Sequence, residues 1–207
     1  MHPNPIYRKA SDEENLSYAR AQSFGMLAVC GSEVPLISHI PFLLSQDGGW
    51  VEFHLVRSNP IVRIKAPLRA RLAIQGPHGY VSPDWYGVAD QVPTWNYIAV
   101  HLLGEVELRP ADELRDLLDR QSALFEGRLM PKPPWQAAKM TPDVLHRLMR
   151  QIVPCRMRVD KVEGTWKLNQ NKPDAVRLSA ARNIENAGLG SETAILAAMM
   201  QDVSAQE

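Results

Sequence analysis

Short segments of alternating apolar and polar residues, separated by turn signals, form most of the first half of the chain. In "WVEFHL", Val51, Phe53 and Leu55 fall on one face while the residues between them are polar, which is the period of a half-buried β-strand. "GSE" and "QDGG" supply the turns between such segments. No regular alternation of strands and helices runs through the chain, which disfavours a doubly wound parallel sheet. The pattern predicts an α+β fold, mainly β, with an antiparallel barrel or sandwich and added helices.

Three strands and one loop matter most for a site. "RARLAIQG" predicts a strand, and "GPHGYVSPDWYGVADQVPTWN" reads as a long loop after it. A long strand then follows, in which Ile98, Val100 and Leu102 alternate with the residues between them. "CRMRVDKVEG" predicts a further strand that "TWKLNQNKP" ends.

Helices are expected where capping signals precede an apolar stripe. Ser11 followed by Glu14 is a capping-box signature, so a helix is expected from Asp12 to about Ser23. Asn59 before Pro60 marks the start of a short helix. The other predicted helices cover residues 110–127, 141 to about 151, 172–186 and 191–201.

The 207 residues are expected to form one domain, with a C-terminal helical extension over about residues 172–203. No apolar run is long enough to cross a bilayer, and the N-terminus has no signal-peptide core, so we expect a cytoplasmic protein without a membrane partner. Cys30 and Cys155 lie in alternating segments, which predicts two buried thiols rather than a disulfide.

The charge is balanced, since 23 basic residues face 23 acidic ones. A protein that binds DNA by itself usually carries a basic excess, because phosphate contacts supply most of the affinity. A local basic tilt runs from Arg156 to Arg182, and it reads either as a solvated face or as a contact for a phosphate-bearing ligand. Direct DNA binding by this chain is therefore doubtful.

Several familiar chemistries have no motif in the sequence. There is no G-x-S-x-G nucleophile elbow, no phosphate-binding loop and no histidine pair with zinc-site spacing. What remains are five polar and aromatic clusters at strand ends: "SHIPF", "HLVRSNP", "QGPHGYVSPDWY", "VPTWNY" and "WKLNQNK". They could simply shape turns and cover barrel ends. Their shared content of flat rings, amides and cations favours a planar heteroaromatic ligand with a phosphate tail.

These five stretches, in this order, resemble the PaiB family, which is described as FMN-binding negative transcriptional regulators. The resemblance extends from Tyr7 to about Leu189 and is most specific in "VPTWNY" combined with "KLNQN". A second family motif, G-H-x-A-x-A-N-P, reads "FHLVRSNP" here and departs from the pattern at Phe53, Val56 and Ser58.

The resemblance implies the antiparallel split β-barrel of flavin-reductase-like and pyridoxamine-phosphate-oxidase-like proteins, with peripheral helices. It also implies a homodimer that binds FMN. Arg57 and Asn59 are candidates for the phosphate, and Lys167 for the cofactor or the partner chain. The full set of candidate cofactor-binding residues is Ser38, His39, His54, Arg57, Asn59, Tyr80, Ser82, Trp85, Thr94, Trp95, Asn96, Lys167, Gln170 and Asn171.

Three functions remain open on this basis. The first is an FMN-binding negative transcriptional regulator whose effect on genes is direct or indirect. The second is an FMN-dependent oxidoreductase, and the third is a haem-binding split barrel. The candidates include no evident general acid–base pair or nucleophile, so any catalysis would rest on the flavin.

Overall fold

The computed structural model describes residues 1–31, 33–64 and 68–203. The strands are β1 (Phe24–Val29), β2 (Leu36–Pro41), β3 (Leu43–Leu44), β4 (Trp50–Val56), β5 (Leu68–Val81), β6 (Thr94–Leu108), β7 (Ile152–Lys167) and β8 (Gly190–Ser191). The α-helices are α1 (Asp12–Gln22), α2 (Leu114–Gly127), α3 (Pro142–Met149), α4 (Asp174–Ala187) and α5 (Thr193–Gln201). The 3-10 helices are η1 (Pro5–Tyr7), η2 (Pro60–Arg63), η3 (Pro83–Tyr86), η4 (Ala111–Glu113) and η5 (Ala137–Lys139).

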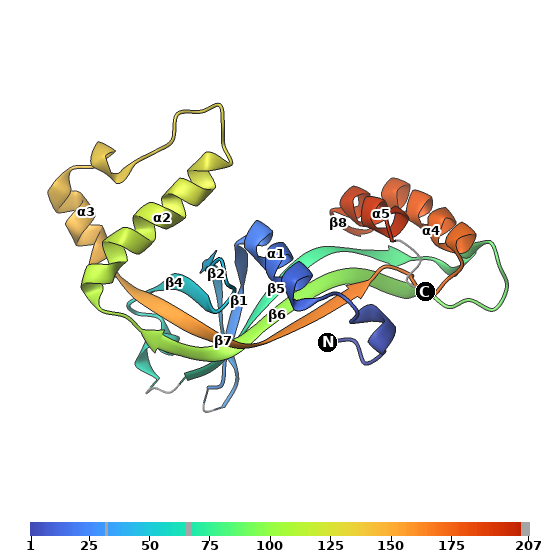
Figure 1. Ribbon diagram of the computed structural model, residues 1–207, viewed down its shortest axis with the longest axis horizontal. Coiled ribbons are helices and arrows are strands. Elements are labelled where there is room, and N and C mark those ends of the chain that lie inside the picture. The colour runs from blue at the N-terminus through green and yellow to red at the C-terminus, as the bar shows by residue number, and fades with distance from the viewer. Residues whose placement is uncertain (32, 65–67, 204–207) are drawn as a thin grey trace. The chain divides into compact units, whose positions relative to one another are not determined.

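The strands form an antiparallel sheet in the order β2-β1-β5-β6-β7-β4-β3, with β8 paired to β5 (Figure 1). Phe42 alone joins β2 to β3, so the two strands at the ends of this order follow each other in the chain. This is the predicted α+β architecture, an antiparallel split β-barrel with peripheral helices.

The chain forms two compact units, which are described separately here. The barrel unit comprises Leu16–Ile74 and His101–Val162. The helix-covered unit comprises Met1–Asn15, Gln75–Val100 and Glu163–Glu207. The boundaries between them fall within α1, β5, β6 and β7.

The barrel unit has an apolar core supplied by alternate strand residues. Leu27, Phe53, Leu72 and Met157 are fully buried, as the alternation in their segments predicts. β6 and β7 approach each other so closely at Gly104 that a Cβ there would overlap with a backbone carbonyl of β7. The core therefore depends on strand pairing that only glycine allows at this point.

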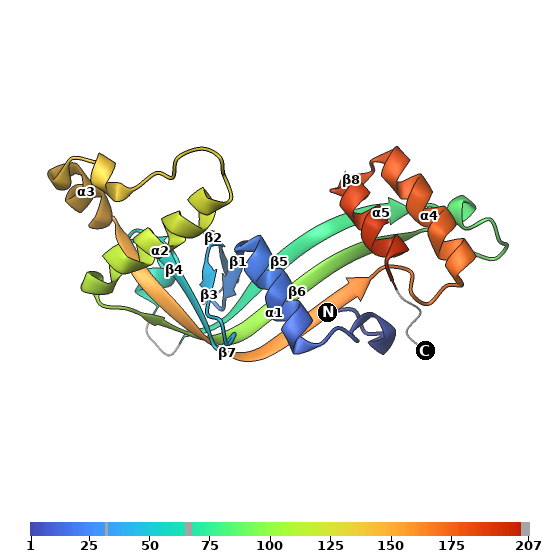
Figure 2. The same ribbon diagram turned by 45° about the horizontal axis from the view of Figure 1, so that its top comes forward.

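The helix-covered unit is built from the ends of β5, β6 and β7 with α4 and α5 above them (Figure 2). α4 packs on α5 and on η3. Ile184, Leu196 and Met200 are fully buried between these elements. Two helices, predicted from the C-terminal sequence, thus cover one end of the long strands.

The predicted loop between residues 76 and 96 is wrong at both ends. β5 continues to Val81, and β6 already begins at Thr94. Pro77, Gly79 and Val81 are buried in alternation with the residues between them. Proline and glycine concealed this period, because they read as turn residues in a sequence. β7 likewise continues to Lys167 instead of ending before "TWK".

The local helix signals are confirmed. The Ser11 amide donates to Glu14 Oε2 at 2.7 Å, and the Glu14 amide donates to Ser11 Oγ at 3.2 Å, which is the predicted capping box. Asn59 caps η2, so the predicted short helix is present as a 3-10 helix. Both capping signals therefore mark the start of a helix correctly.

The two cysteines are free and differ in environment. Cys155 is buried, and burial raises the pKa of its thiol to about 12. The expectation that Cys30 is buried is wrong: Cys30 is exposed, because β1 ends one residue earlier at Val29. In the described ranges, no helix is both long and apolar enough to span a membrane.

Candidate functional site

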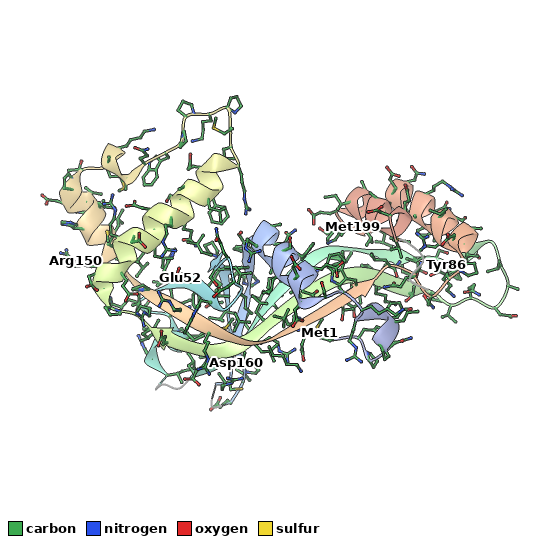
Figure 3. The ribbon with its side chains drawn as sticks, viewed as in Figure 1. Met1, Glu52, Tyr86, Arg150, Asp160 and Met199 are labelled. Carbon is green, nitrogen blue, oxygen red and sulfur yellow. The ribbon has the colours of Figure 1, made fainter. Side chains whose placement is uncertain are left out.

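The candidate residues fall into two groups, each within one unit. The Asn59 group lies in the barrel unit and consists of Ser38, His39, His54, Arg57 and Asn59. The Trp95 group lies in the helix-covered unit and consists of Tyr80, Ser82, Trp85, Thr94, Trp95, Asn96, Lys167, Gln170 and Asn171. Figure 3 labels Glu52 in the first unit and Tyr86 in the second as landmarks.

Asn59 joins two elements of the barrel unit. Its Nδ2 donates to Ser38 Oγ on β2 at 2.6 Å, and its Oδ1 accepts from the Ile61 amide at 2.9 Å. Both ends of the amide are therefore engaged in capping η2 and in holding it to β2. This part of the "HLVRSNP" cluster therefore stabilises the fold.

Arg57 fixes the end of β4 to the junction between α3 and β7. Its Nε donates to the Arg150 carbonyl at 2.8 Å, and its Nη2 donates to the Ile152 carbonyl at 3.2 Å. Its backbone amide donates to the Gln151 carbonyl at 2.7 Å. Two of the three guanidinium nitrogens are thus bonded to backbone before any phosphate is considered.

The two histidines of the Asn59 group differ in exposure. His54 lies half-buried on β4, and burial lowers the pKa of its imidazole, an effect that a hydrogen bond with the Gln121 side chain partly opposes. His39 lies exposed on β2 and stacks on Phe24, with ring centroids 6.4 Å apart. Within the described ranges, neither ring is hydrogen-bonded to a carboxylate that would mark it as a general base.

The Trp95 group contains a set of neighbouring rings. The Tyr80 ring centroid lies 6.3 Å from that of Trp85 and 6.2 Å from that of Trp95. Trp95 Nε1 donates to His78 Nδ1 at 3.2 Å, and the Trp95 side of this set is open, since Trp95 is 40% exposed. His78 was absent from the sequence candidates, although it lies in the same predicted loop as Tyr80.

Lys167 brings a positive charge to the start of β6. Its ammonium donates to Thr94 Oγ and, at 2.9 Å, to the Trp95 carbonyl. It lies 5.9 Å from the centroid of the Tyr7 ring, and burial lowers the pKa of the amine. An ammonium has three donors, so one N–H remains for a ligand. "TWK" and "VPTWNY", far apart in sequence, meet here.

Two further members of the Trp95 group form hydrogen bonds to neighbouring elements. Asn96 is fully buried, and its Nδ2 donates to Met200 Sδ at 3.4 Å. Ser82 precedes η3, and its carbonyl accepts from the Trp85 amide at 3.2 Å. Both residues hold neighbouring elements in place.

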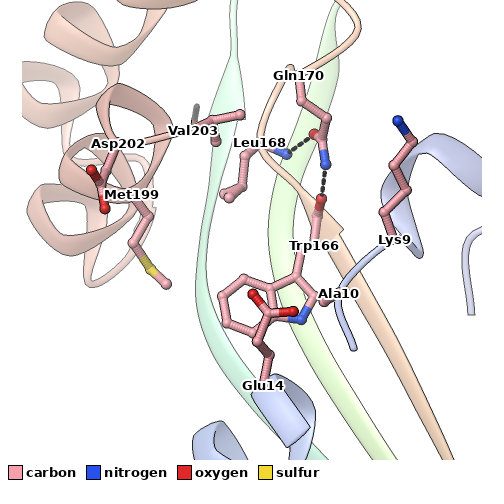
Figure 4. A pocket seen from close by; sticks show the side chains of 9 residues that line it. All are labelled: Lys9, Ala10, Glu14, Trp166, Leu168, Gln170, Met199, Asp202 and Val203. Carbon is pink, nitrogen blue, oxygen red and sulfur yellow. Dashed lines mark hydrogen bonds between the residues drawn. The ribbon is translucent and has the colours of Figure 1, made fainter. Parts of the chain in front are cut away.

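Gln170 and Asn171 lie in the turn after β7. Gln170 folds back on its own backbone: its Oε1 accepts from the Leu168 amide at 2.8 Å, and its Nε2 donates to the Trp166 carbonyl (Figure 4). Asn171 is exposed. Gln170 therefore stabilises the turn, while Asn171 faces solvent.

Gln170 also lines a surface cavity of about 310 Å³ in the helix-covered unit (Figure 4). The other lining residues are Lys9, Ala10, Glu14, Trp166, Leu168, Met199, Asp202 and Val203. Glu14 and Asp202 give this cavity two negative charges against the one positive charge of Lys9. A phosphate is disfavoured there, so this cavity does not supply the phosphate contact that a flavin nucleotide needs.

The Trp95 group fits a planar, negatively charged ligand. The exposed Trp95 ring can cover a flat heteroaromatic system, and the N–H of Lys167 that has no bond to the described residues can bind an anion. In the described part of the chain, no cluster of three or more histidine, cysteine, aspartate or glutamate residues could hold a metal ion. The side chains of this group can therefore bind a planar ligand and supply a positive charge, and they fit FMN better than a metal ion.

Comparisons with known proteins agree with this chemistry. The family model described as "Putative FMN-binding domain" matches residues 1–161. The chain is similar to "Protease synthase and sporulation protein PAI 2" of Bacillus subtilis (strain 168), with 28% identity over 186 residues and 88% of each chain covered.

Solved structures show the same fold at low sequence identity. An FAD and haem binding protein from Mycobacterium smegmatis matches with a TM-score of 0.55 and 16% identity, covering 78% of this chain and 73% of that chain. A conserved hypothetical protein from Mycobacterium tuberculosis matches with a TM-score of 0.57 and 12% identity, covering 83% of this chain and 94% of that chain.

Proposed function

Because the chain belongs to the family of the "Putative FMN-binding domain", which bears out the resemblance of its motifs to PaiB, we propose that it binds FMN through the Trp95 group. In this proposal the flavin ring packs against Trp95 and Tyr80, and Lys167 binds the phosphate. When bound, FMN supplies redox chemistry that no side chain of this group can perform.

One observation carries the assignment to Lys167. Its ammonium is partly withdrawn from water and held at the start of β6 by Thr94 Oγ and the Trp95 carbonyl, and its third N–H has no bond to the described residues. Arg57, the alternative phosphate ligand, also keeps one nitrogen, Nη1, without a bond to the described residues, but the exposed indole of Trp95 lies in the same unit as Lys167. A charge-assisted contact contributes on the order of 1.5–3 kcal/mol. We therefore expect FMN to bind more tightly than riboflavin.

A fluorescence titration with FMN and with riboflavin tests this proposal. The account expects FMN to bind about ten to a hundred times more tightly than riboflavin. Equal affinities for FMN and riboflavin would contradict the assignment of Lys167 to the phosphate. An absorbance spectrum of the purified protein adds a second readout, because a Soret band in place of flavin bands would favour the haem alternative.

A homodimer is part of the same proposal. β1 and β2 pair with Ala28 opposite Ile37 and Met26 opposite His39, and cross-strand partners share one face of a sheet. On this face Phe24 is 54% exposed and Ile37 is 59% exposed. A second copy of the chain would cover this apolar strip. Sedimentation of wild type as a dimer and of Ile37→Glu as a monomer is expected; a monomeric wild type at micromolar concentration would contradict it.

Any effect on transcription is proposed to be indirect. The basic tilt is largely neutralised within the chain: Arg156 binds Glu52 at 2.9 Å, and Arg158 binds Asp160 at 2.9 Å. Arg177 is only 3% exposed. Few free cations remain to release counterions from DNA, so affinity at physiological salt is expected to be low.

A mobility-shift assay with promoter DNA, with and without FMN, tests the indirect role. Sequence-selective, submicromolar binding at physiological salt would overturn it. Absence of binding in both states would leave the regulator role indirect and move the FMN-dependent oxidoreductase to first place.

A further inference from the structure

A second cavity, of about 300 Å³, lies in the barrel unit where β4, α2, α3 and β7 come together. Arg150, labelled in Figure 3, belongs to its lining. The complete lining is Arg57, Ala111, Leu114, His146, Met149, Arg150 and Ile152. The cavity is separate from the Trp95 group, which belongs entirely to the other unit.

The lining combines an apolar surface with positive charge. Ala111, Leu114, Met149 and Ile152 are apolar, and no acidic side chain belongs to the lining. Arg57 and Arg150 are cations, and His146 adds a polar ring. Such a lining complements a molecule that is apolar at one end and carries a negative charge at the other.

The positive side of the cavity is held rigidly. The hydrogen bonds from Arg57 to the carbonyls of Arg150 and Ile152 fix its guanidinium plane. Nη1 of Arg57 makes no hydrogen bond within residues 1–31, 33–64 and 68–203, so it is free to donate to a ligand. A pre-positioned donor lowers the entropy cost of binding an anion.

We propose that this cavity binds a small apolar molecule with a single anionic group, such as a medium-chain or aromatic carboxylate. The carboxylate bonds to Arg57 and Arg150, and the apolar part covers Leu114, Met149 and Ile152. The volume is at the lower end of the range of about 300–1,000 Å³ for ligand pockets, so a short chain or one ring fits.

Isothermal titration calorimetry of the FMN-loaded protein with three probes tests the charge requirement. Octanoate carries the anionic group, octanamide has the same shape without charge, and octylamine reverses the charge. Octanoate is expected to bind at least about tenfold more tightly than octanamide, and octylamine not at all. Equal binding of octanoate and octanamide, or no binding of octanoate, would overturn the proposal.

Variants locate the binding. Arg150→Gln is expected to weaken octanoate binding about tenfold, while Arg147→Gln, on the same helix and outside the lining, leaves it unchanged. Both positions are exposed, so thermal melts should match wild type. Equal losses in the two variants would contradict the site. Competition between octanoate and FMN would also overturn it, because the cavity would then belong to the cofactor site.

Discussion

The Asn59 group and the Trp95 group are similar in composition but differ in what their polar atoms do. In the Asn59 group the amide of Asn59 bonds to Ser38 and to η2, and Arg57 bonds to two carbonyls. In the Trp95 group, Lys167 bonds to Thr94 and to the Trp95 carbonyl and keeps one N–H without a bond to the described residues, and the Trp95 indole is 40% exposed. The polar atoms of the first group mostly bond within the fold, with Arg57 Nη1 left unbonded among the described residues, whereas the second group adds an exposed indole that can cover a flavin ring.

This difference shows why composition alone overestimates a site. A polar residue at a strand end can form hydrogen bonds to backbone groups or remain available to bind a ligand. Asparagine, serine and arginine suit both uses. Only the partners of each atom separate the two uses. We assign fold stability to the Asn59 group and FMN binding to the Trp95 group, and each assignment can be tested separately.

The largest expected effect concerns Lys167. Lys167→Met removes the ammonium but keeps most of the apolar stem, so FMN affinity is expected to fall about ten- to hundredfold. Lys172→Met is the matched control, since that ammonium lies over the Tyr86 ring, 4.9 Å from its centroid, and bonds to Gln91. Fluorescence titrations of both variants measure the effect. Similar losses in the two would mean that a diffuse positive field, and not Lys167, binds the anion.

The next effect concerns Asn59. Asn59→Ala removes the cap of η2 and its bond to β2, which should lower the free energy of unfolding by about 1–2 kcal/mol. FMN affinity should stay within about twofold of wild type. Urea denaturation measures the free energy of unfolding of this variant, and an FMN titration measures its affinity for FMN. Full stability combined with a loss of FMN binding would reverse the roles of the two groups.

A smaller effect is expected at Trp95. Trp95→Leu keeps an apolar side chain but removes the ring, which should cost about 0.5–1.5 kcal/mol of binding free energy. Because the proposal places the ring against the flavin and not the phosphate, FMN and riboflavin should lose affinity by the same factor. A loss confined to FMN would place the indole at the phosphate instead.

The smallest effect is a pH dependence of stability in the Asn59 group. Burial lowers the pKa of His54 below its unfolded value, so the unfolded chain takes up this proton first as pH falls. The stability contributed by neutral His54 is present above about pH 6.5 and is lost as pH falls through the lowered pKa. Urea midpoints between about pH 7.5 and 5 should therefore decline less in His54→Leu than in wild type. Identical slopes would show that His54 is solvated.

Much of the fold could be predicted from the sequence, because its signals are local. The Ser11–Glu14 capping box and the Asn59 cap both depend on residues within a few positions of each other. The end of β5 was missed, since Gly79 and Pro77 resemble turn residues although they are buried in a strand.

The site was harder to predict, because its contacts join distant segments. The resemblance named Trp95 and Lys167, but their bond joins β6 to β7 across 72 positions of sequence. His78 carries no sequence signal, and it contacts Trp95 only because two long strands bring the rings together. Nor could the sequence reveal that Arg57 is already bonded to backbone.

The ratio of riboflavin to FMN dissociation constants, measured for wild type, Lys167→Met and Arg57→Met, tests the central claim most directly. This ratio isolates the phosphate contact, because the flavin ring is common to both ligands. The account predicts a ratio of about 10–100 in wild type and in Arg57→Met, and a ratio near one in Lys167→Met. A ratio near one in Arg57→Met with the wild-type ratio kept in Lys167→Met would place the phosphate in the Asn59 group and contradict the account.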